Sequence, residues 1–232
     1  MRIYNQLISR RKLKDLFDSI STYYESTNKV LSLGLDRIWR DKLADFADGV
    51  VLDLACGTAE MTSRFSCKSS VSKVFGADMS KKMIKWGIQN KKFCREVNFA
   101  VSYAENLPFK DDTFDTVCVA FGLRNFENLS LAISEIKRVL KNKGKFISID
   151  TLKPNSAILP FYKFYLLYVI PSITNILLGK RNDYIYMAKS ILNYMTQEEL
   201  TDFLKKFDFE NIKHINLTLG IVTITICENR KA

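Results

Sequence analysis

A loop of small residues is the first feature of this 232-residue chain that could bind a ligand. It follows the apolar run 50–54 and contains Ala55, Gly57, Thr58 and Ala59. Small residues at a turn from a strand to a helix let a ligand approach the backbone, and the first turn of the helix offers free N–H donors. We therefore expect Gly57 and Thr58 to contact a bound cofactor.

Two carboxylates flank this loop. Asp78 ends the next apolar run, and an acidic residue about 20 positions after such a loop can accept both ribose hydroxyls of an adenosine cofactor. Asp53 precedes the glycine, where it would repel a pyrophosphate but could meet the positive methionine end of S-adenosylmethionine. The G-x-G-x-x-G pattern of dinucleotide-binding proteins is missing from the loop. These residues favour S-adenosylmethionine over a dinucleotide as the cofactor.

Seven β-rich runs, with helical patterns between several of them, would position these residues. Five runs are mostly apolar, which is typical of buried parallel strands, and they cover 50–54, 74–78, 97–101, 116–121 and 145–150. Helical patterns cover 58–66, 80–92, for which Ser80 is the expected N-cap, and 129–141. The last two runs, 212–218 and 221–227, are separated by a short turn at Gly220 and should pair as an antiparallel hairpin. We predict an α/β fold with a doubly wound, mostly parallel, Rossmann-like seven-stranded sheet and a C-terminal antiparallel hairpin.

The chain is expected to form a single domain, residues 1–232, with two helical segments outside the sheet pattern. Residues 1–47 would form amino-terminal helices, and residues 155–195 a helical lid inserted before the hairpin. Residues 157–178 are apolar enough to suggest a membrane span. However, Pro160 and Pro171 interrupt them, and a span would separate the hairpin from its sheet. A lid over the sheet edge is therefore favoured.

The formal net charge of +10 is typical of proteins with a polyanionic partner, either nucleic acid or an anionic membrane, unless basicity is general in the source proteome. Beyond residues 10–12 there is no dense basic tract with interleaved aromatic residues, so no nucleic acid is expected. The lid could be a plain cover, or it could also dip into the membrane interface through Tyr162, Tyr165 and Tyr168. Peripheral contact with an anionic membrane thus stays open.

The five cysteines are odd in number and form no C-x-x-C pair, so neither a disulfide framework nor a zinc site is expected. One histidine, His214, and no cluster of carboxylates leave no metal site in the prediction. Residues 1–15 lack the apolar core of a secretory signal, so the protein is expected to be cytoplasmic.

Several motifs closely resemble the ubiquinone/menaquinone biosynthesis C-methyltransferase family, over nearly the whole chain. They are segments 24–34 (YESTNKVLSLG), 37–40 (RIWR), 52–58 (LDLACGT), 104–109 (AENLPF), 121–125 (FGLRN) and 138–141 (RVLK). The resemblance implies a class I methyltransferase that uses S-adenosylmethionine to methylate a ring carbon of a prenylated quinol. It also implies a cofactor pocket lined by Thr58, Asp78, Tyr103, Ala104 and Ala120. A homo-oligomer stays open.

The chain departs from the family pattern at several positions. Asn142-Lys143-Gly144 replaces Pro-Gly-Gly, Asp150 replaces a glutamate, and Ala59 replaces the third glycine of the loop. Tyr103 stands where a small polar residue or asparagine is usual, and Ala120 where a serine can touch the cofactor. Backbone N–H and C=O groups at these positions can still bind the cofactor.

Arg124 and Asn125 are the residues expected near the quinol oxygen, because they follow the fourth strand at the edge where open α/β sheets bind ligands. Arg124 is permanently charged, so it would stabilise a developing quinolate rather than accept a proton. Without the motif, a structural ion pair would be the favoured interpretation of Arg124. Tyr24 could close the pocket from the amino-terminal helices or simply pack in the core.

Two other functions stay open. One is methylation of another small molecule or of RNA, which the net charge prompts, although the Pro-Pro-aromatic motif of amino-group methylation is absent after the fourth strand. The other is a cofactor-binding protein without chemistry, which the substitutions at Tyr103 and Ala120 would permit. The class of quinol, naphthoquinol or benzoquinol, also stays open.

Overall fold

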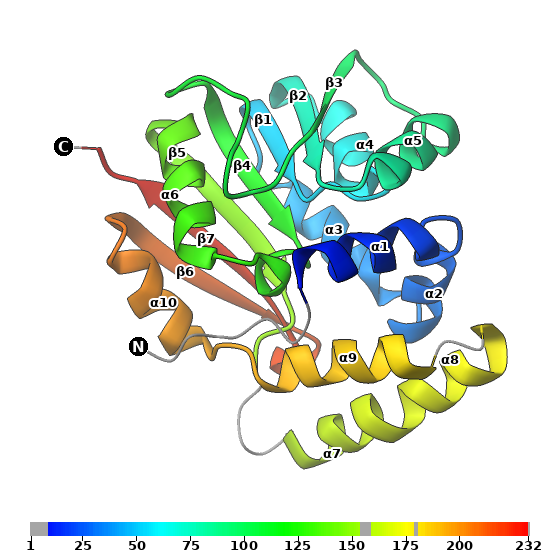
Figure 1. The fold of residues 1–232 in the computed structure, drawn as a ribbon. Coiled ribbons are helices and arrows are strands. Elements are labelled where there is room, and N and C mark those ends of the chain that lie inside the picture. Colours follow the sequence, from blue (N-terminus) through cyan, green and yellow to red (C-terminus); the bar gives the residue numbers. More distant parts are fainter. Residues whose placement is uncertain (1–8, 154–158, 179–180, 232) are drawn as a thin grey trace.

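The computed structural model describes residues 9–153, 159–178 and 181–231. They contain one seven-stranded sheet in the order β3-β2-β1-β4-β5-β7-β6 (Figure 1). Its strands are β1 (Gly49–Leu54), β2 (Val71–Asp78), β3 (Val97–Val101), β4 (Phe114–Ala120), β5 (Leu140–Asp150), β6 (Phe209–Leu217) and β7 (Val222–Asn229). Neighbouring strands are parallel except for β7, which is antiparallel to both β5 and β6. The prediction of a mostly parallel sheet that ends in an antiparallel hairpin is confirmed.

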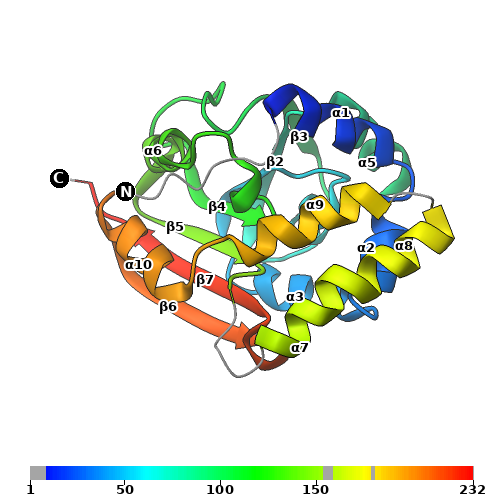
Figure 2. The same cartoon turned by 60° about the horizontal axis from the view of Figure 1, so that its bottom comes forward.

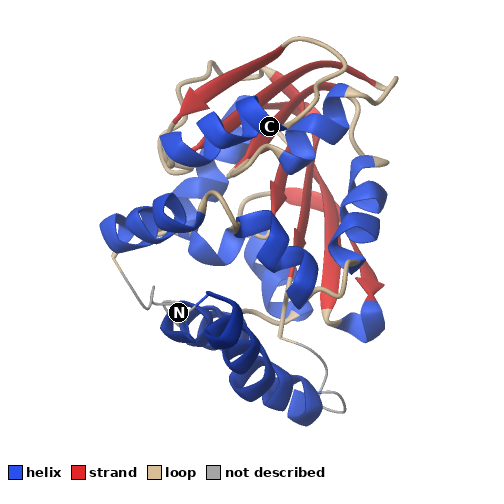
Figure 3. Ribbon diagram, turned by 90° about the vertical axis from the view of Figure 1, so that its right-hand side faces the viewer, coloured by secondary structure: helices blue, strands red, loops and turns tan. Residues whose placement is uncertain are grey.

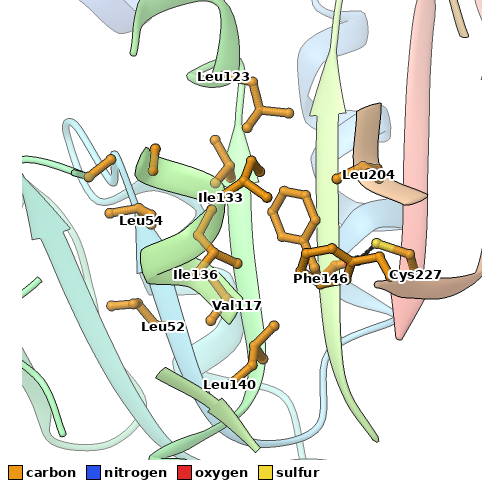
Figure 4. Close-up of a cluster of buried hydrophobic side chains, with 14 of the residues drawn as sticks. Leu52, Leu54, Val117, Leu123, Ile133, Ile136, Leu140, Phe146, Leu204 and Cys227 are labelled. Carbon is orange, nitrogen blue, oxygen red and sulfur yellow. Dashed lines mark hydrogen bonds between the residues drawn. The ribbon is translucent and has the colours of Figure 1, made fainter. Parts of the chain in front are cut away.

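Helices cover both faces of this sheet. On one face α6 (Leu129–Val139) packs against Leu52 and Leu54 of β1, and Leu204 of α10 (Gln197–Lys205) lies beside Phe146 of β5 in the same apolar cluster (Figure 4). On the other face α3 (Leu35–Ala44) and α4 (Glu60–Ser66) pack with Val51 in a second cluster. Because both faces of β1 are buried, its sequence is a continuous apolar run rather than an alternating pattern. The helix α5 (Lys81–Asn90) follows β2, and Ser80 caps it by accepting the backbone N–H of Met83, as expected.

A second group of helices lies at the carboxyl ends of the parallel strands. It contains α1 (Arg10–Ile20), α2 (Tyr24–Leu31), and the lid, which we define as α7 (Leu159–Phe164), a π-helical turn (Tyr165–Val169), α8 (Ile170–Leu178) and α9 (Arg181–Leu192). Figure 2 views the molecule from this end, and the side view of Figure 3 shows the same group beyond the sheet. The lid has its own apolar cluster, which includes Leu166, Ile170 and Ile191. Residues 1–8, 155–158 and 179–180 of the predicted helical segments lie outside the described residues.

The lid does not form a membrane-spanning helix. Within the described ranges, no helix combines the length and the apolar composition that a membrane crossing requires. The alternative of a cover at the sheet edge agrees with the packing of the lid, because Tyr165 donates its hydroxyl hydrogen to the backbone oxygen of Leu31 in α2 at 2.9 Å.

The start of β5 differs from the prediction. The sequence predicted a helix through residue 141 and a strand from 145, but α6 ends at Val139 and β5 begins at Leu140. The polar residues Asn142, Lys143 and Gly144 hid the start of the strand because they carry no apolar signal. Lys143 has a left-handed φ of 62°, and the pairing register between β4 and β5 shifts in this region.

The expectation that the chain has no disulfide is wrong. The sulfur atoms of Cys67 and Cys94 are bonded to each other. Cys67 follows α4, and Cys94 lies in the loop before β3, where its backbone N–H donates to the hydroxyl oxygen of Ser66 at 3.0 Å. The fold thus brings together two cysteines that are 27 positions apart, a spacing that carried no signal of its own. Cys56, Cys118 and Cys227 are buried and free.

Candidate functional site

Three cavities adjoin the carboxyl edge of the sheet, where the order of strands reverses between β1 and β4. Ligands of open α/β sheets bind at such a switch point. The loop cavity, of about 80 Å³, includes Gly57, Asp78, Tyr103, Ala104 and Ala120 in its wall. The apolar chamber, of about 450 Å³, lies between α1, α2 and the lid, and the polar cavity, of about 510 Å³, lies between α2, α3 and α4.

Tyr24, at the start of α2, lines all three cavities. Phe17, Phe121 and Asn125 line both the loop cavity and the apolar chamber. Phe17 packs edge-on against Tyr24, with their ring centroids 6.1 Å apart. These four side chains therefore form a wall between the two cavities, and we call them the shared wall.

Glycine is needed at two places around the loop. Gly57 has a left-handed φ of 52°, and a Cβ placed there would meet no atom within 4 Å, so the space beside it is available to a ligand. Gly87 of α5 faces the other side of the loop, where a Cβ would lie only 2.7 Å from the backbone oxygen of Thr58. We did not predict the role of Gly87, although a glycine inside a helical pattern is a signal of close packing.

Asp78 is held rigidly at the wall of the loop cavity. Its Oδ2 atom accepts the backbone N–H of Gly57 at 2.8 Å, and its Oδ1 atom accepts that of Ser80 at 2.7 Å. Burial raises the pKa of Asp78 to about 6, against the opposing effect of these two hydrogen bonds. Each carboxylate oxygen can accept a further hydrogen bond, so the pair of oxygens can also receive two vicinal hydroxyls.

The structure places Asp53 behind the loop, where it does not contribute to the wall of the three cavities. Its carboxylate is buried and accepts the hydroxyl hydrogen of Thr62 in α4. Burial raises the pKa of Asp53 to about 7, although the hydrogen bond from Thr62 and the charge of Arg40 both lower it. Any effect of Asp53 on a ligand is therefore electrostatic or passes through another group.

The remaining residues expected at the cofactor divide between two cavities. Tyr103, Ala104 and Ala120 line the loop cavity together with Gly57 and Asp78, whereas Thr58 lines the polar cavity. Sequence reasoning missed the apolar part of the loop cavity, to which Leu13, Met79 and Met83 contribute. The position of Met79 directly after Asp78, the predicted acceptor of the ribose hydroxyls, was an available signal.

Arg124 lies in the short 3-10 turn after β4 (Leu123–Asn125) and lines the apolar chamber. Its side chain is 10% exposed and forms an ion pair with Asp150, at the end of β5, which is 2% exposed. Its Nη1 atom also donates to the backbone oxygen of Phe121 at 3.1 Å. The side chain is thus both a member of a buried ion pair and a charge at the chamber wall.

Part of this ion pair remains unsatisfied. Among the described residues, the Nε atom of Arg124 and the Oδ2 atom of Asp150 are buried without a hydrogen-bond partner. Asp150 uses its Oδ1 atom to accept the backbone N–H of Thr151 at 2.8 Å. Asn125, the next residue after Arg124, lies in the shared wall, so the two predicted residues come together at the end of the chamber.

The sheet order, the antiparallel β7 and the acid at the end of β2 define a class I methyltransferase fold. The same fold is seen in a SAM-dependent methyltransferase of solved structure from Thermotoga maritima. The two superpose with a TM-score of 0.66 and 16% identity, over 94% of this chain and 100% of that chain.

Sequence comparison gives the family. Residues 5–228 match the ubiE/COQ5 methyltransferase family, and the chain belongs to it. It is 34% identical over 223 residues to the ubiquinone/menaquinone biosynthesis C-methyltransferase UbiE of Geotalea daltonii, covering 92% of this chain and 94% of that protein. It is 35% identical over 201 residues to the demethylmenaquinone methyltransferase of Thermotoga maritima, covering 84% of this chain and 86% of that protein. The resemblance noted in the motifs is confirmed.

Proposed function

We propose that this protein transfers the methyl group of S-adenosylmethionine to a ring carbon of a prenylated quinol, in the biosynthesis of menaquinone or ubiquinone. The observation that carries the proposal is the shared wall of Phe17, Tyr24, Phe121 and Asn125. A cofactor bound at Asp78 on one side of this wall would face an apolar acceptor on the other side.

The chain is a methyltransferase of its family, and its cofactor is S-adenosylmethionine. When bound, that cofactor supplies an electrophilic methyl group on a sulfonium ion. The loop cavity suits its adenosine part, because the Asp78 carboxylate can accept two ribose hydroxyls while the bare backbone at Gly57 leaves room beside it. In this proposal Tyr103, Ala104 and Ala120 surround the adenosine, Thr58 faces the methionine part, and Asp53 acts from behind the loop.

Two lines of support favour a prenylated quinol as the acceptor. The relatives from Geotalea daltonii and Thermotoga maritima are named for C-methylation in ubiquinone or menaquinone biosynthesis and for demethylmenaquinone, respectively. The apolar chamber is lined by many aliphatic and aromatic side chains from α1, α2 and the lid, which suits a prenyl chain. They include Leu16, Ile20, Leu31, Tyr165, Leu166 and Ile191.

Arg124 is the proposed catalytic residue. Its guanidinium group keeps a positive charge at all working pH values, and burial strengthens its interaction with a negative oxygen. It would stabilise the quinolate charge that makes the neighbouring ring carbon nucleophilic. Asp150 would position Arg124 by the ion pair between them.

Asn125 and Tyr24 are proposed to align the two reactants. Both side chains border the loop cavity and the chamber, so they can contact an acceptor ring and the cofactor at once. Holding the ring carbon in line with the transferred methyl group is the largest contribution that such residues can make to the rate.

Contact with a membrane surface is a further part of the proposal. Of the three tyrosines predicted at a membrane interface, Tyr168 is 61% exposed, whereas Tyr162 is buried and Tyr165 is half-buried. Phe161 and Phe164, 80% and 61% exposed, lie in the same part of the lid. Phe161 also lines the apolar chamber. A surface of this kind would let the chamber exchange a membrane-dissolved quinol, and the positive net charge would favour anionic lipid.

Incubation with methyl-labelled S-adenosylmethionine and a reduced demethylated quinol, either naphthoquinol or benzoquinol, tests the proposed reaction. We expect label on a ring carbon of at least one quinol, located by mass spectrometry and NMR of the product. The oxidised quinones serve as controls, because they lack the hydroxyl that activates the ring. Cofactor binding without transfer to either quinol would contradict the proposed substrate class.

A further inference from the structure

Arg40 of α3 is a buried cation without a counter-ion among the residues that the structure describes. The residue is 7% exposed, and its Nε atom has no hydrogen-bond partner among the described residues. In that part of the chain it also forms no ion pair within 4 Å. Arg37, one turn earlier on the same helix, contrasts with it, because the Arg37 side chain is 82% exposed and lies near Asp41.

The surroundings of Arg40 do not offset the cost of its burial. Its guanidinium group stands over the Phe121 ring, 5.0 Å from the centroid. Such a contact contributes about 2 kcal/mol when desolvated, whereas burial of an unpaired charge costs several kcal/mol. The charge of Arg40 lowers the pKa of Asp53, but the Asp53 carboxylate accepts its hydrogen bond from Thr62 and forms no ion pair with Arg40. The unpaired guanidinium group therefore indicates a site for an anionic ligand.

The position of Arg40 among the cavities indicates which anionic group it would bind. Arg40 lines both the apolar chamber and the polar cavity, and Thr58, the residue after Gly57, lines the polar cavity with it. The ring on which Arg40 stands, Phe121, belongs to the shared wall that borders the loop cavity. An adenosine held at Asp78 would therefore have Arg40 on the other side of the shared wall, close to Thr58.

We propose that Arg40 binds the carboxylate at the amino-acid end of S-adenosylmethionine. This inference rests on the proposed function, because it assumes that the adenosine part occupies the loop cavity. A prenylated quinol carries no carboxylate, and its hydroxyl is assigned to Arg124. A guanidinium group presents parallel N–H donors that match a carboxylate, and the free Nε–H is one of them.

Binding measurements with two ligands test this assignment. S-adenosylhomocysteine has the carboxylate, and 5′-methylthioadenosine keeps the nucleoside and the sulfur but lacks the amino-acid end. By calorimetry, Arg40→Met should weaken S-adenosylhomocysteine binding about 10- to 100-fold, the range for a lost charged hydrogen bond. Binding of 5′-methylthioadenosine should change less than about twofold. The matched control Lys42→Met, at an exposed position of α3 outside the walls of the three cavities, should change neither affinity.

The melting temperature of the Arg40→Met variant provides a second readout. Methionine preserves the length of the buried stem but removes the unpaired charge, so Arg40→Met should raise the melting temperature without ligand and lower the stabilisation by S-adenosylhomocysteine. Equal loss of affinity for both ligands, or no loss for either, would overturn the assignment. If the wild-type protein binds neither ligand, the proposed function itself fails.

NMR of the wild-type protein covers the case in which Arg40→Met does not fold. The Arg40 Nε–H resonance, assigned by its absence from Arg40→Lys, should shift on addition of S-adenosylhomocysteine and stay in place with 5′-methylthioadenosine. Equal shifts with the two ligands would contradict a carboxylate contact.

Discussion

Arg124 and Arg40 are both buried near the carboxyl edge of the sheet, but within the described part of the chain only Arg124 has a carboxylate partner. The motif around residue 124 predicted a functional arginine, and a structural ion pair was the alternative interpretation of the same residue. The structure is compatible with both roles at once, because Asp150 pairs with the guanidinium group and holds it at the chamber wall. The importance of Arg40 was not predictable, since burial without a partner depends on contacts between α3 and the residue after β4.

Substitution of Arg124 by methionine should abolish most turnover and also destabilise the fold. It leaves Asp150 as an unpaired buried carboxylate, which costs about 3 to 5 kcal/mol. The double variant Arg124→Met/Asp150→Leu should recover much of that stability in urea unfolding while kcat stays about 100- to 1000-fold below wild type. Recovery of kcat in the double variant would show that the ion pair is structural only.

Asp78 offers a test of the cofactor site at the same scale. Asn at this position keeps one oxygen acceptor but turns an NH2 group toward one of the two backbone donors. Asp78→Asn should weaken S-adenosylhomocysteine binding about 10- to 100-fold by calorimetry, as expected for charged hydrogen bonds. Asp202→Asn, on the exposed side of α10, should bind like wild type. An unchanged affinity in Asp78→Asn would remove Asp78 from the site.

The two buried carboxylates predict opposite pH trends for stability and binding. The pKa values of Asp53 and Asp78 are raised to about 7 and about 6, so the folded state holds protons that the unfolded state releases. Their contribution to stability is present at low pH and is lost as pH rises through 6 to 7. Between pH 8 and pH 5 the free protein should gain about 4 kcal/mol from these groups, while cofactor affinity falls as Asp78 is protonated.

Urea unfolding at several pH values measures this gain, and calorimetry measures the affinity. The variant Asp53→Asn should lose the part of the pH dependence of stability that lies near pH 7 and keep the part near pH 6. A pH dependence identical to that of the wild type would contradict the raised pKa of Asp53.

At the scale of elements, the loop after β1 keeps its shape although alanine stands at two positions where a glycine would be expected. Ala55 and Ala59 have left-handed φ values of 57° and 61°, a conformation that glycine adopts without strain. The loop keeps its shape because Asp78 and α5 fix it from both sides. The sequence predicted this turn correctly, since its position between an apolar run and a helical pattern outweighs the missing glycines.

The connection between α4 and β3 could not be predicted in the same way. The bond between Cys67 and Cys94 depends on the approach of two loops, which is set by packing rather than by spacing. The start of β5 was misplaced because its first residue, Leu140, gains its strand pairing from Phe114 of β4, whereas the polar residues after it form an irregularity and regular pairing resumes only at Lys145. Both errors concern contacts between distant segments, whereas the buried strands could be predicted from their own apolar runs.

Reduction of the Cys67–Cys94 bond should destabilise the protein. The bond closes a loop across 27 positions, and bonds of this kind contribute about 2 to 4 kcal/mol, chiefly by restricting the unfolded chain. Urea unfolding with and without dithiothreitol should show this difference. The double variant Cys67→Ser/Cys94→Ser should match the reduced protein and be insensitive to dithiothreitol. Indifference of the wild type to the reductant would contradict the prediction.

At the scale of the whole molecule, the helices gather in two functionally different groups. Those on the faces of the sheet bury its core, whereas α1, α2 and the lid enclose the cavities at one end (Figures 1 and 2). The doubly wound sheet was predictable because its strands and helices alternate along the chain. The arrangement of the lid was not, because an apolar stretch suits a lid, a core helix and a membrane contact equally well.

Vesicle sedimentation tests the exposed aromatic side chains of the lid. Vesicles with anionic lipid should bind the wild-type protein at low salt, and Phe161→Ser/Phe164→Ser should reduce the bound fraction at least threefold because about 2 kcal/mol or more of apolar burial is lost. The control variant Ile88→Ser changes an exposed apolar residue of α5, outside the lid, and should bind like wild type. Binding of the double variant at the wild-type level would contradict a membrane role for this surface.

The placement of β7 has a consequence for biosynthesis on the ribosome. The last strand of the chain lies inside the sheet, between β5 and β6, and supplies the hydrogen-bond partner of each. While residues 222–229 are still in the exit tunnel, β5 has an open edge and β6 has no place to dock. The nascent chain is therefore exposed to aggregation until residues 222–229 have left the tunnel, and chaperone capture is most useful before that point.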